Sequence, residues 1–186
     1  KLDGDYAIMS RTKLSAGYDY DETKRTHSEI EKSREHTYRV GLRRSMTVGI
    51  DGSIGYARSD RKNLGYDGNA TFEGSYTAAV VAANIYDNHP LLRKFNYADR
   101  QRDKVKLALN ASPHETVALQ FRADYSNDDY NNSRLGITGS RSQSYTVDAA
   151  FTPRQGMTLY AYYTYDNIRS DQSGRTFSGN STAVPP

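Results

Sequence analysis

Strict alternation of apolar and polar residues is the feature that most constrains this chain. From Val117 to Tyr125 every second residue is apolar, and Gln120, Arg122 and Asp124 stand between them. A period of two residues places the apolar side chains on one face of a β-strand and the polar side chains on the other. The same pattern recurs along most of the chain, so it predicts strands that have one apolar face and one charged face.

Eight segments of this kind predict eight strands, which pair as four hairpins. The strands lie near residues 1–9, 12–23, 35–44, 46–60, 100–112, 116–127, 142–153 and 156–168. Tight turns are expected at 10–11, near 44–45, at 112–115 and at 153–155. The last two contain Pro113 and Pro153, which have no N–H to donate to a ladder. Residues 1–178 then form one segment of four hairpins, with long polar loops at 24–34, 61–99 and 128–141, and 179–186 form a tail.

The composition narrows the fold class. Leu, Ile, Val and Phe supply 31 of the 186 residues, too few for an ordinary soluble core, whereas a net charge of +3 and 16 tyrosines argue against disorder. Each predicted strand has about the 9–11 residues that cross a bilayer when tilted, and short turns alternate with long loops. We therefore predict an all-β, antiparallel transmembrane β-barrel. The alternative is a soluble β-sandwich, which would need two apolar inner faces.

The alternation also assigns the residues to faces, and a slip of one residue would exchange the two sets. The residues expected to face lipid are Leu14, Tyr18, Val40, Leu42, Val48, Ile50, Leu107, Leu109, Leu119, Phe121, Val147 and Phe151. The residues expected to face the bore are Lys104, Lys106, Gln120, Arg122, Asp124, Thr146 and Asp148. Tyrosines gather toward the strand ends, where an aromatic girdle would meet the lipid headgroups. The low-polarity stretch 77–84 is expected to form a short helix in the long loop, or a loop folded into the lumen.

No group of residues indicates catalysis or a bound cofactor. The absence of cysteine excludes disulfides, thiolate metal sites and covalent haem attachment in this chain. Ser10 and Lys13 match S-x-x-K but lie between two strands, and His27, His36, His89 and His114 are far apart in sequence. Residues 126–132 are rich in Asp and Asn but lack EF-hand spacing. We therefore predict a protein that is not an enzyme, with no metal site and no nucleic-acid partner.

Several segments, in order along the chain, resemble the MtrB/PioB family of decahaem-associated outer-membrane β-barrels. The similar segments run from His89 to Leu109, Asp124 to Tyr130, Leu135 to Thr138, Ser144 to Pro153, Leu159 to Asp166 and Ser170 to Arg175, with Gly17 to Asp21 and Lys24-Arg25 before them. The resemblance covers most of residues 1–178 and is strongest from 89 to 175. Because members of that family are much longer, it implies that these eight or so strands are an incomplete segment of a larger barrel.

The resemblance also implies a function. The family forms a porin-like sheath in the outer membrane of Gram-negative bacteria, encloses a multihaem c-type cytochrome and supports electron transfer across that membrane. On this reading the chain itself binds no cofactor, its partners are the cytochrome and the lipid bilayer, and haem c is carried by the cytochrome. A general diffusion porin remains the alternative function. An outer-membrane hydrolase is a third possibility, but no Ser/His/Asp cluster with suitable spacing supports it.

Overall fold

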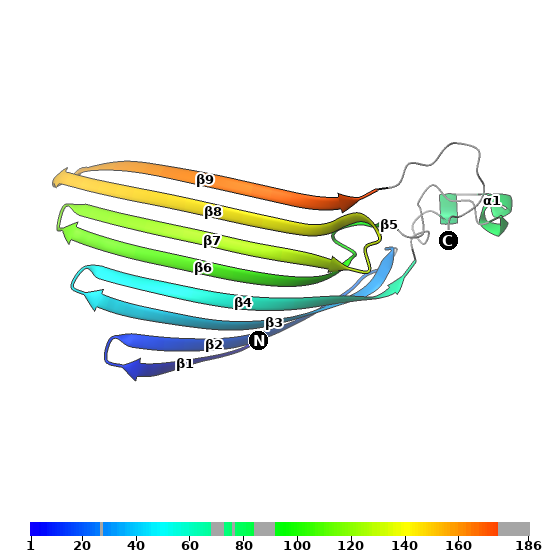
Figure 1. Cartoon of the computed structure of the whole chain (residues 1–186), viewed down its shortest axis with the longest axis horizontal. Helices are drawn as coiled ribbons and strands as arrows, with labels where there is room; N and C mark the ends of the chain where they lie inside the picture. The colour runs from blue at the N-terminus through cyan, green and yellow to red at the C-terminus, as the bar shows by residue number, and fades with distance from the viewer. Residues whose placement is uncertain (27, 68–72, 76, 84–91, 175–186) are drawn as a thin grey trace.

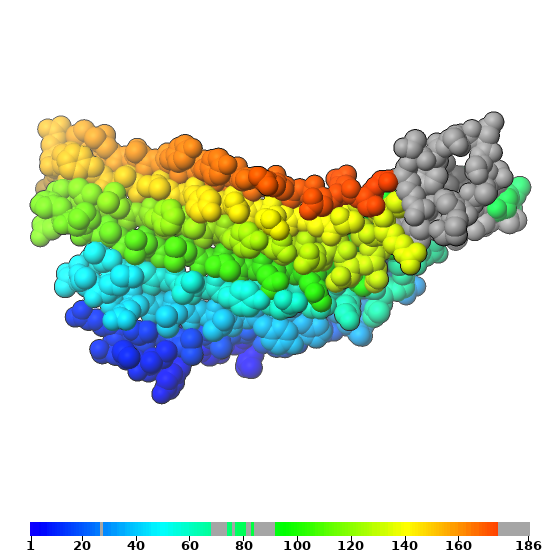
Figure 2. All heavy atoms as spheres, viewed as in Figure 1, coloured from blue at the N-terminus to red at the C-terminus, as the bar shows by residue number. Residues whose placement is uncertain are grey.

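The strands join into a single antiparallel sheet in the computed structural model, which describes residues 1–26, 28–67, 73–75, 77–83 and 92–174. The elements are β1 (Leu2–Met9), β2 (Thr12–Lys24), β3 (Ile30–Thr47), β4 (Ile50–Tyr66), the 3-10 turn η1 (Glu73–Ser75), α1 (Ala78–Ala82), β5 (Leu92–Arg93), β6 (Asp99–His114), β7 (Val117–Asn131), β8 (Leu135–Arg154) and β9 (Met157–Ser173). The eight long strands lie side by side in chain order (Figures 1 and 2). The two-residue β5 pairs in parallel with the start of β8.

The sheet is open within the described residues. β1 pairs only with β2, β9 pairs only with β8, and the two edge strands lie at opposite sides of the molecule (Figure 1). An open edge cannot persist in lipid, because unpaired backbone groups there have no water to bind. The predicted open segment of an antiparallel barrel is therefore confirmed, with eight long strands and one short strand.

One face of the sheet is an apolar belt. Register places Leu14, Leu42, Ile54, Leu107 and Ala123 in one row across neighbouring strands. Leu107 and Leu119 are each 41% exposed, so no second layer of described residues covers this face. The β-sandwich alternative is therefore wrong. Of the residues expected to face lipid, eleven lie on this face in strands; Val48 instead lies in a turn.

The turns differ from the prediction in their positions. β3 continues to Thr47, so the turn expected near Arg44-Ser45 is formed by Val48 and Gly49, and Gly49 has a φ of +79° that favours glycine. Pro113 and Pro153 lie inside the ends of β6 and β8, where the register shifts, and not in turns. A bulge leaves one residue out of the ladder, so that residue needs no N–H donor. A bulge can therefore hold a proline, just as a turn can.

The strands are also longer than predicted at the end that carries the loops. β2 ends at Lys24 and β3 begins at Ile30, so residues 24–34 lie mostly in strands. In the same way, β7 ends at Asn131 and β8 begins at Leu135, so residues 128–141 lie mostly in strands. β4 and β6 likewise shorten the connection expected at 61–99. The apolar alternation stops in these extensions because both faces carry polar residues, although the hydrogen-bonded ladder continues.

All two-residue turns lie at one end of the sheet and all longer connections at the other (Figure 1). The longest connection contains α1, as expected for the low-polarity stretch, whose last residue, 84, lies outside the described residues. No described helix is long and apolar enough to span a membrane. A small core forms at the loop end, where Ile30, Ala98 and Leu135 are buried.

Candidate functional site

The second face of the sheet, which we call the polar face, contains all seven residues predicted to face the bore. Lys106 lies opposite Asp124, and Lys104 lies opposite Ser126 on the same face. Arg122 lies opposite Thr146, and Gln120 opposite Asp148, on the next pair of strands. Pairs that are directly opposite share a face of an antiparallel sheet, so register brings the seven together. Whether a partner contacts them stays a prediction.

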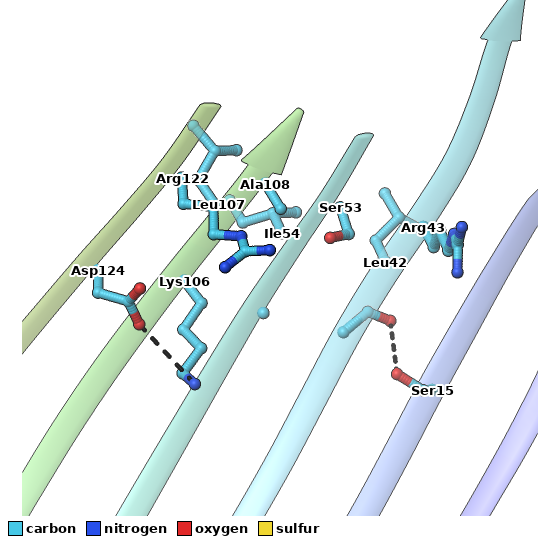
Figure 3. A pocket seen from close by; sticks show the side chains of 12 residues that line it. Ser15, Leu42, Arg43, Ser53, Ile54, Lys106, Leu107, Ala108, Arg122 and Asp124 are labelled. Carbon is cyan, nitrogen blue, oxygen red and sulfur yellow. Dashed lines mark hydrogen bonds and ion pairs between the residues drawn. The ribbon is translucent and has the colours of Figure 1, made fainter. Parts of the chain in front are cut away.

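Short polar contacts link several of these side chains. Lys106 Nζ lies 3.8 Å from Asp124 Oδ1, and the two side chains point toward each other from β6 and β7 (Figure 3). Gln120 donates to Asn110 Oδ1 at 2.6 Å, and Arg122 donates to Gln120 Oε1 at 2.6 Å. Lys106, Arg122 and Asp124 border a hollow of about 510 Å³ between β2 and β7. Lys106 and Arg122 remain exposed, so this part of the face is hydrated.

Ion pairs on the same face become closer toward the loop end, and sequence reasoning missed them. Arg102 binds Asp128 through two hydrogen bonds of 2.6 Å, with Asp128 almost fully buried. Arg100 lies 2.8 Å from Glu35. Two-point contacts between Arg and a carboxylate are the strongest of their kind. Extending the alternation of β6 by two residues would have placed Arg102 on this face, but its partner follows only from register.

Several cations of the polar face have no acidic partner among the described residues, and three of them lie in the stretch behind the apolar belt. Lys13, Lys104 and Arg122 are in no ion pair with the described residues. Lys13 lies opposite Arg43, which is paired with Asp51 at 3.3 Å. Asp5, Asp148 and Asp166 of the same face are also in no ion pair with the described residues. The polar face therefore presents unpaired charges of both signs over the stretch of the strands that carries the apolar belt on its other side.

A short segment, Leu92–Ala98, folds over the loop end of the polar face. Arg61 of β4 donates to the carbonyl oxygens of Phe95 and Ala98, at 2.8 and 3.0 Å. Lys94 Nζ lies 2.5 Å from Glu29 Oε1, and Glu29 is only 2% exposed. Donation to the Glu29 carboxylate raises the pKa of Lys94 above its ordinary value. The contact thus ties the long connection to the start of β3.

Tyrosines mark the loop-side border of the apolar belt. Tyr18 and Tyr38 are paired across β2 and β3, with ring centroids 5.2 Å apart. Tyr145 and Tyr165 are paired across β8 and β9, at 6.5 Å. When positions on the same face are counted along the strands, the second pair lies two positions nearer the short turns than the first. This oblique border is typical of strands that are tilted to the bilayer.

The S-x-x-K match, the described histidines and the Asp- and Asn-rich stretch do not assemble into a site. Ser10 lies in the first turn and Lys13 in β2, while residues 126–131 lie in β7. His36 accepts or donates a 2.7 Å hydrogen bond with Tyr18, and His114 contacts Thr116 at a turn. His27 and His89 lie outside the described residues. Over the described part of the chain, no cluster of three or more His, Asp or Glu side chains could hold a metal ion.

Comparison with known proteins gives consistent matches. A family model described as "Putative outer membrane beta-barrel porin, MtrB/PioB" matches residues 1–183. The chain is also 29% identical over 178 residues to "Outer membrane protein MtrB" of Shewanella baltica (strain OS185). That alignment covers 94% of this chain and 23% of the relative, so the chain spans about a quarter of the length of this relative.

Proposed function

The chain belongs to the MtrB/PioB family of outer-membrane β-barrel proteins, and from this premise we propose that its polar face lines the bore of a larger barrel that encloses a multihaem c-type cytochrome. The barrel is the insulating wall, and electrons cross the outer membrane through haems carried by the enclosed protein. In this proposal the haem ligands belong to the enclosed protein. Its contribution is an apolar belt toward lipid and a charged surface toward the cytochrome.

One observation supports this proposal most strongly: the eight long strands form an open sheet, and no other described segment covers its polar face between the short turns and the segment Leu92–Ala98. A closed barrel of eight strands would fill its interior with packed side chains. Here Lys106 and Arg122 are exposed, and the strand edges β1 and β9 are free to pair with further strands. A wide bore of this kind can accept a folded protein.

The unpaired cations supply the second support. Lys104 and Arg122, which form no ion pair among the described residues, would face acidic groups on the enclosed partner. Charge complementarity of this kind sets the register of a complex and accelerates its formation. A carboxylate-bearing partner surface, which includes haem propionates at the protein surface, matches that requirement.

The test uses the full-length protein, expressed with the cytochromes of its own cell and purified in mild detergent. We expect haem absorbance to co-purify with the barrel, and Lys104→Glu with Arg122→Glu to lower the haem content per barrel. Lys62→Glu is the matched control, because Lys62 is an exposed cation on the opposite face of β4. Purification of the intact complex without haem would refute the proposal.

A general diffusion porin is the second candidate, because a charged, hydrated bore is also the interior of a water-filled channel. The two functions differ in a direct measurement. A diffusion porin conducts ions as purified, whereas a sheath conducts strongly only after its partner is removed. Conductance of the purified complex that is unchanged when the cytochrome is removed would favour the porin.

A further inference from the structure

Two arginines lie directly opposite each other just above the apolar belt, on the face that meets lipid. Arg141 of β8 is the register partner of Arg169 of β9. Both share the face of Tyr145 and Tyr165, which lie four residues nearer the short turns in β8 and β9. Since tyrosines of this kind mark the headgroup level of the bilayer, the arginines lie at or just above that level.

The charges of this arginine pair are not balanced by any of the described residues. Neither guanidinium is in an ion pair with any described residue, and Asp171, one register pair nearer the loops, does not reach them. In the same row of the sheet, Arg58 lies opposite Asp103 and is bound to it at 3.1 Å. Like charges directly opposite in a sheet destabilise it, so this position favours an external anion.

The surroundings of the arginine pair supply further hydrogen-bond donors. Gln143 and Asn167 are also register partners, and they lie between the arginines and the tyrosine pair. The four side chains line a hollow of about 110 Å³. Arg141 Nε also donates to Asn127 Oδ1 at 3.5 Å, which holds one side of that guanidinium toward β7. Two guanidinium groups and two amides converging on a small hollow match the oxygens of a phosphate.

We propose that Arg141, Arg169, Gln143 and Asn167 bind a phosphate group in the headgroup of an outer-leaflet glycolipid. The longer connections lie at this end of the sheet, which in outer-membrane barrels is the extracellular end. The lipid of that leaflet is a phosphorylated glycolipid, so phosphate is present at the level of the arginine pair. A basic pocket beside a tyrosine girdle is the arrangement that binds anionic headgroups. The site is on the opposite face from the bore and is independent of any enclosed partner.

The test uses the full-length barrel, delipidated in detergent and titrated with diphosphorylated lipid A while bound lipid is counted by native mass spectrometry. We expect Arg141→Gln with Arg169→Gln to weaken binding about tenfold or more, because two charge-assisted contacts are lost. The control removes the same charge at the other membrane end, through Arg11→Gln with Arg154→Gln, and should bind as the parent does. Unchanged heat-modifiable mobility on gels shows that each variant is folded.

Three further compounds test whether the ligand is the phosphate of an outer-leaflet glycolipid. Dephosphorylated lipid A should bind equally weakly to the parent and to the Arg141/Arg169 variant. Phosphatidylglycerol should bind less tightly than diphosphorylated lipid A, and inorganic phosphate should not compete at millimolar concentration. Undiminished binding of diphosphorylated lipid A by the double variant would overturn the proposal. A preference for phosphatidylglycerol, or full competition by inorganic phosphate, would overturn the assignment to an outer-leaflet headgroup.

Discussion

Consecutive alanines in β8 allow the assignment of the two faces to be tested with a matched pair of substitutions. Ala149 lies on the apolar face between Leu119 and Ala161, and Ala150 lies on the polar face between Ala118 and Tyr160. Both side chains are half-buried and lie at the same depth, near the middle of the belt of β8. An arginine on the lipid face near the bilayer midplane costs about 2–4 kcal/mol, whereas one in a hydrated bore costs little. Alanine contributes little apolar area, so the cost of the charge dominates.

We therefore expect Ala149→Arg to lower the free energy of unfolding by about 2–4 kcal/mol, and Ala150→Arg by less than about 1 kcal/mol. The first value corresponds to a change of about 30- to 700-fold in the unfolding equilibrium, at about 1.4 kcal/mol per factor of ten. The measurement is urea unfolding of the full-length protein in lipid vesicles, followed by the heat-modifiable gel mobility of the folded barrel. Equal effects at both positions, or a larger effect at Ala150, would refute the assignment of the faces.

Three further predictions concern the two ends of the sheet. Gly49→Ala should destabilise the barrel by about 1 kcal/mol more than Gly156→Ala, since both have positive φ but only at Gly49 would a Cβ meet backbone, 2.8 Å from Ser112 O; equal losses in urea unfolding would contradict this. In intact cells, an impermeant maleimide should label Gly74→Cys and spare Glu115→Cys, and the reverse pattern would invert the orientation in the membrane. Lys94→Met should speed amide hydrogen exchange in 95–98 compared with the parent, because Glu29 is left buried without its cation. Since the pKa of Lys94 is raised, the same loosening should appear in the parent as a loss of protection, relative to the intrinsic exchange rate at each pH, when the pH rises through that raised value. Protection that neither change lowers would show that the contact does not hold the segment.

The sequence contained enough information for the faces of the sheet but not for the ends of the strands. Alternation such as that of Leu107 with Lys106 is set by the pleat, so it survives without any knowledge of neighbouring strands. It fades beyond Tyr125 because Asn127 and Asp129 lie on the lipid-facing side but above the belt, where polar residues are favourable. A ladder that continues through polar residues leaves no periodic signal, so 128–141 resembled a loop.

The prolines and the hairpin of β3 and β4 show a second limit of prediction from the sequence, which concerns the turns. Pro113 was expected in a turn because it cannot donate a hydrogen bond, but the register shift between Ala111 and His114 places it in a bulge. The turn at Val48-Gly49 depends on the positive φ of Gly49, whereas the sequence alone predicted a turn near Arg44-Ser45. Local chemistry thus indicated the right end of the hairpin and missed its exact residues.

The pairing of charges on the polar face depends on register between strands and could not be read from the sequence. Arg102 and Asp128 lie 26 residues apart, yet they form one of the closest ion pairs of the sheet. Toward the loop end, cations such as Arg100 and Arg102 are bound by acids of this chain, whereas Lys104 and Arg122 have no acidic partner among the described residues. Charges that are satisfied internally fix the strands to each other. Charges that remain free are available to whatever occupies the bore, and they lie where the opposite face is the apolar belt, within the thickness of the membrane.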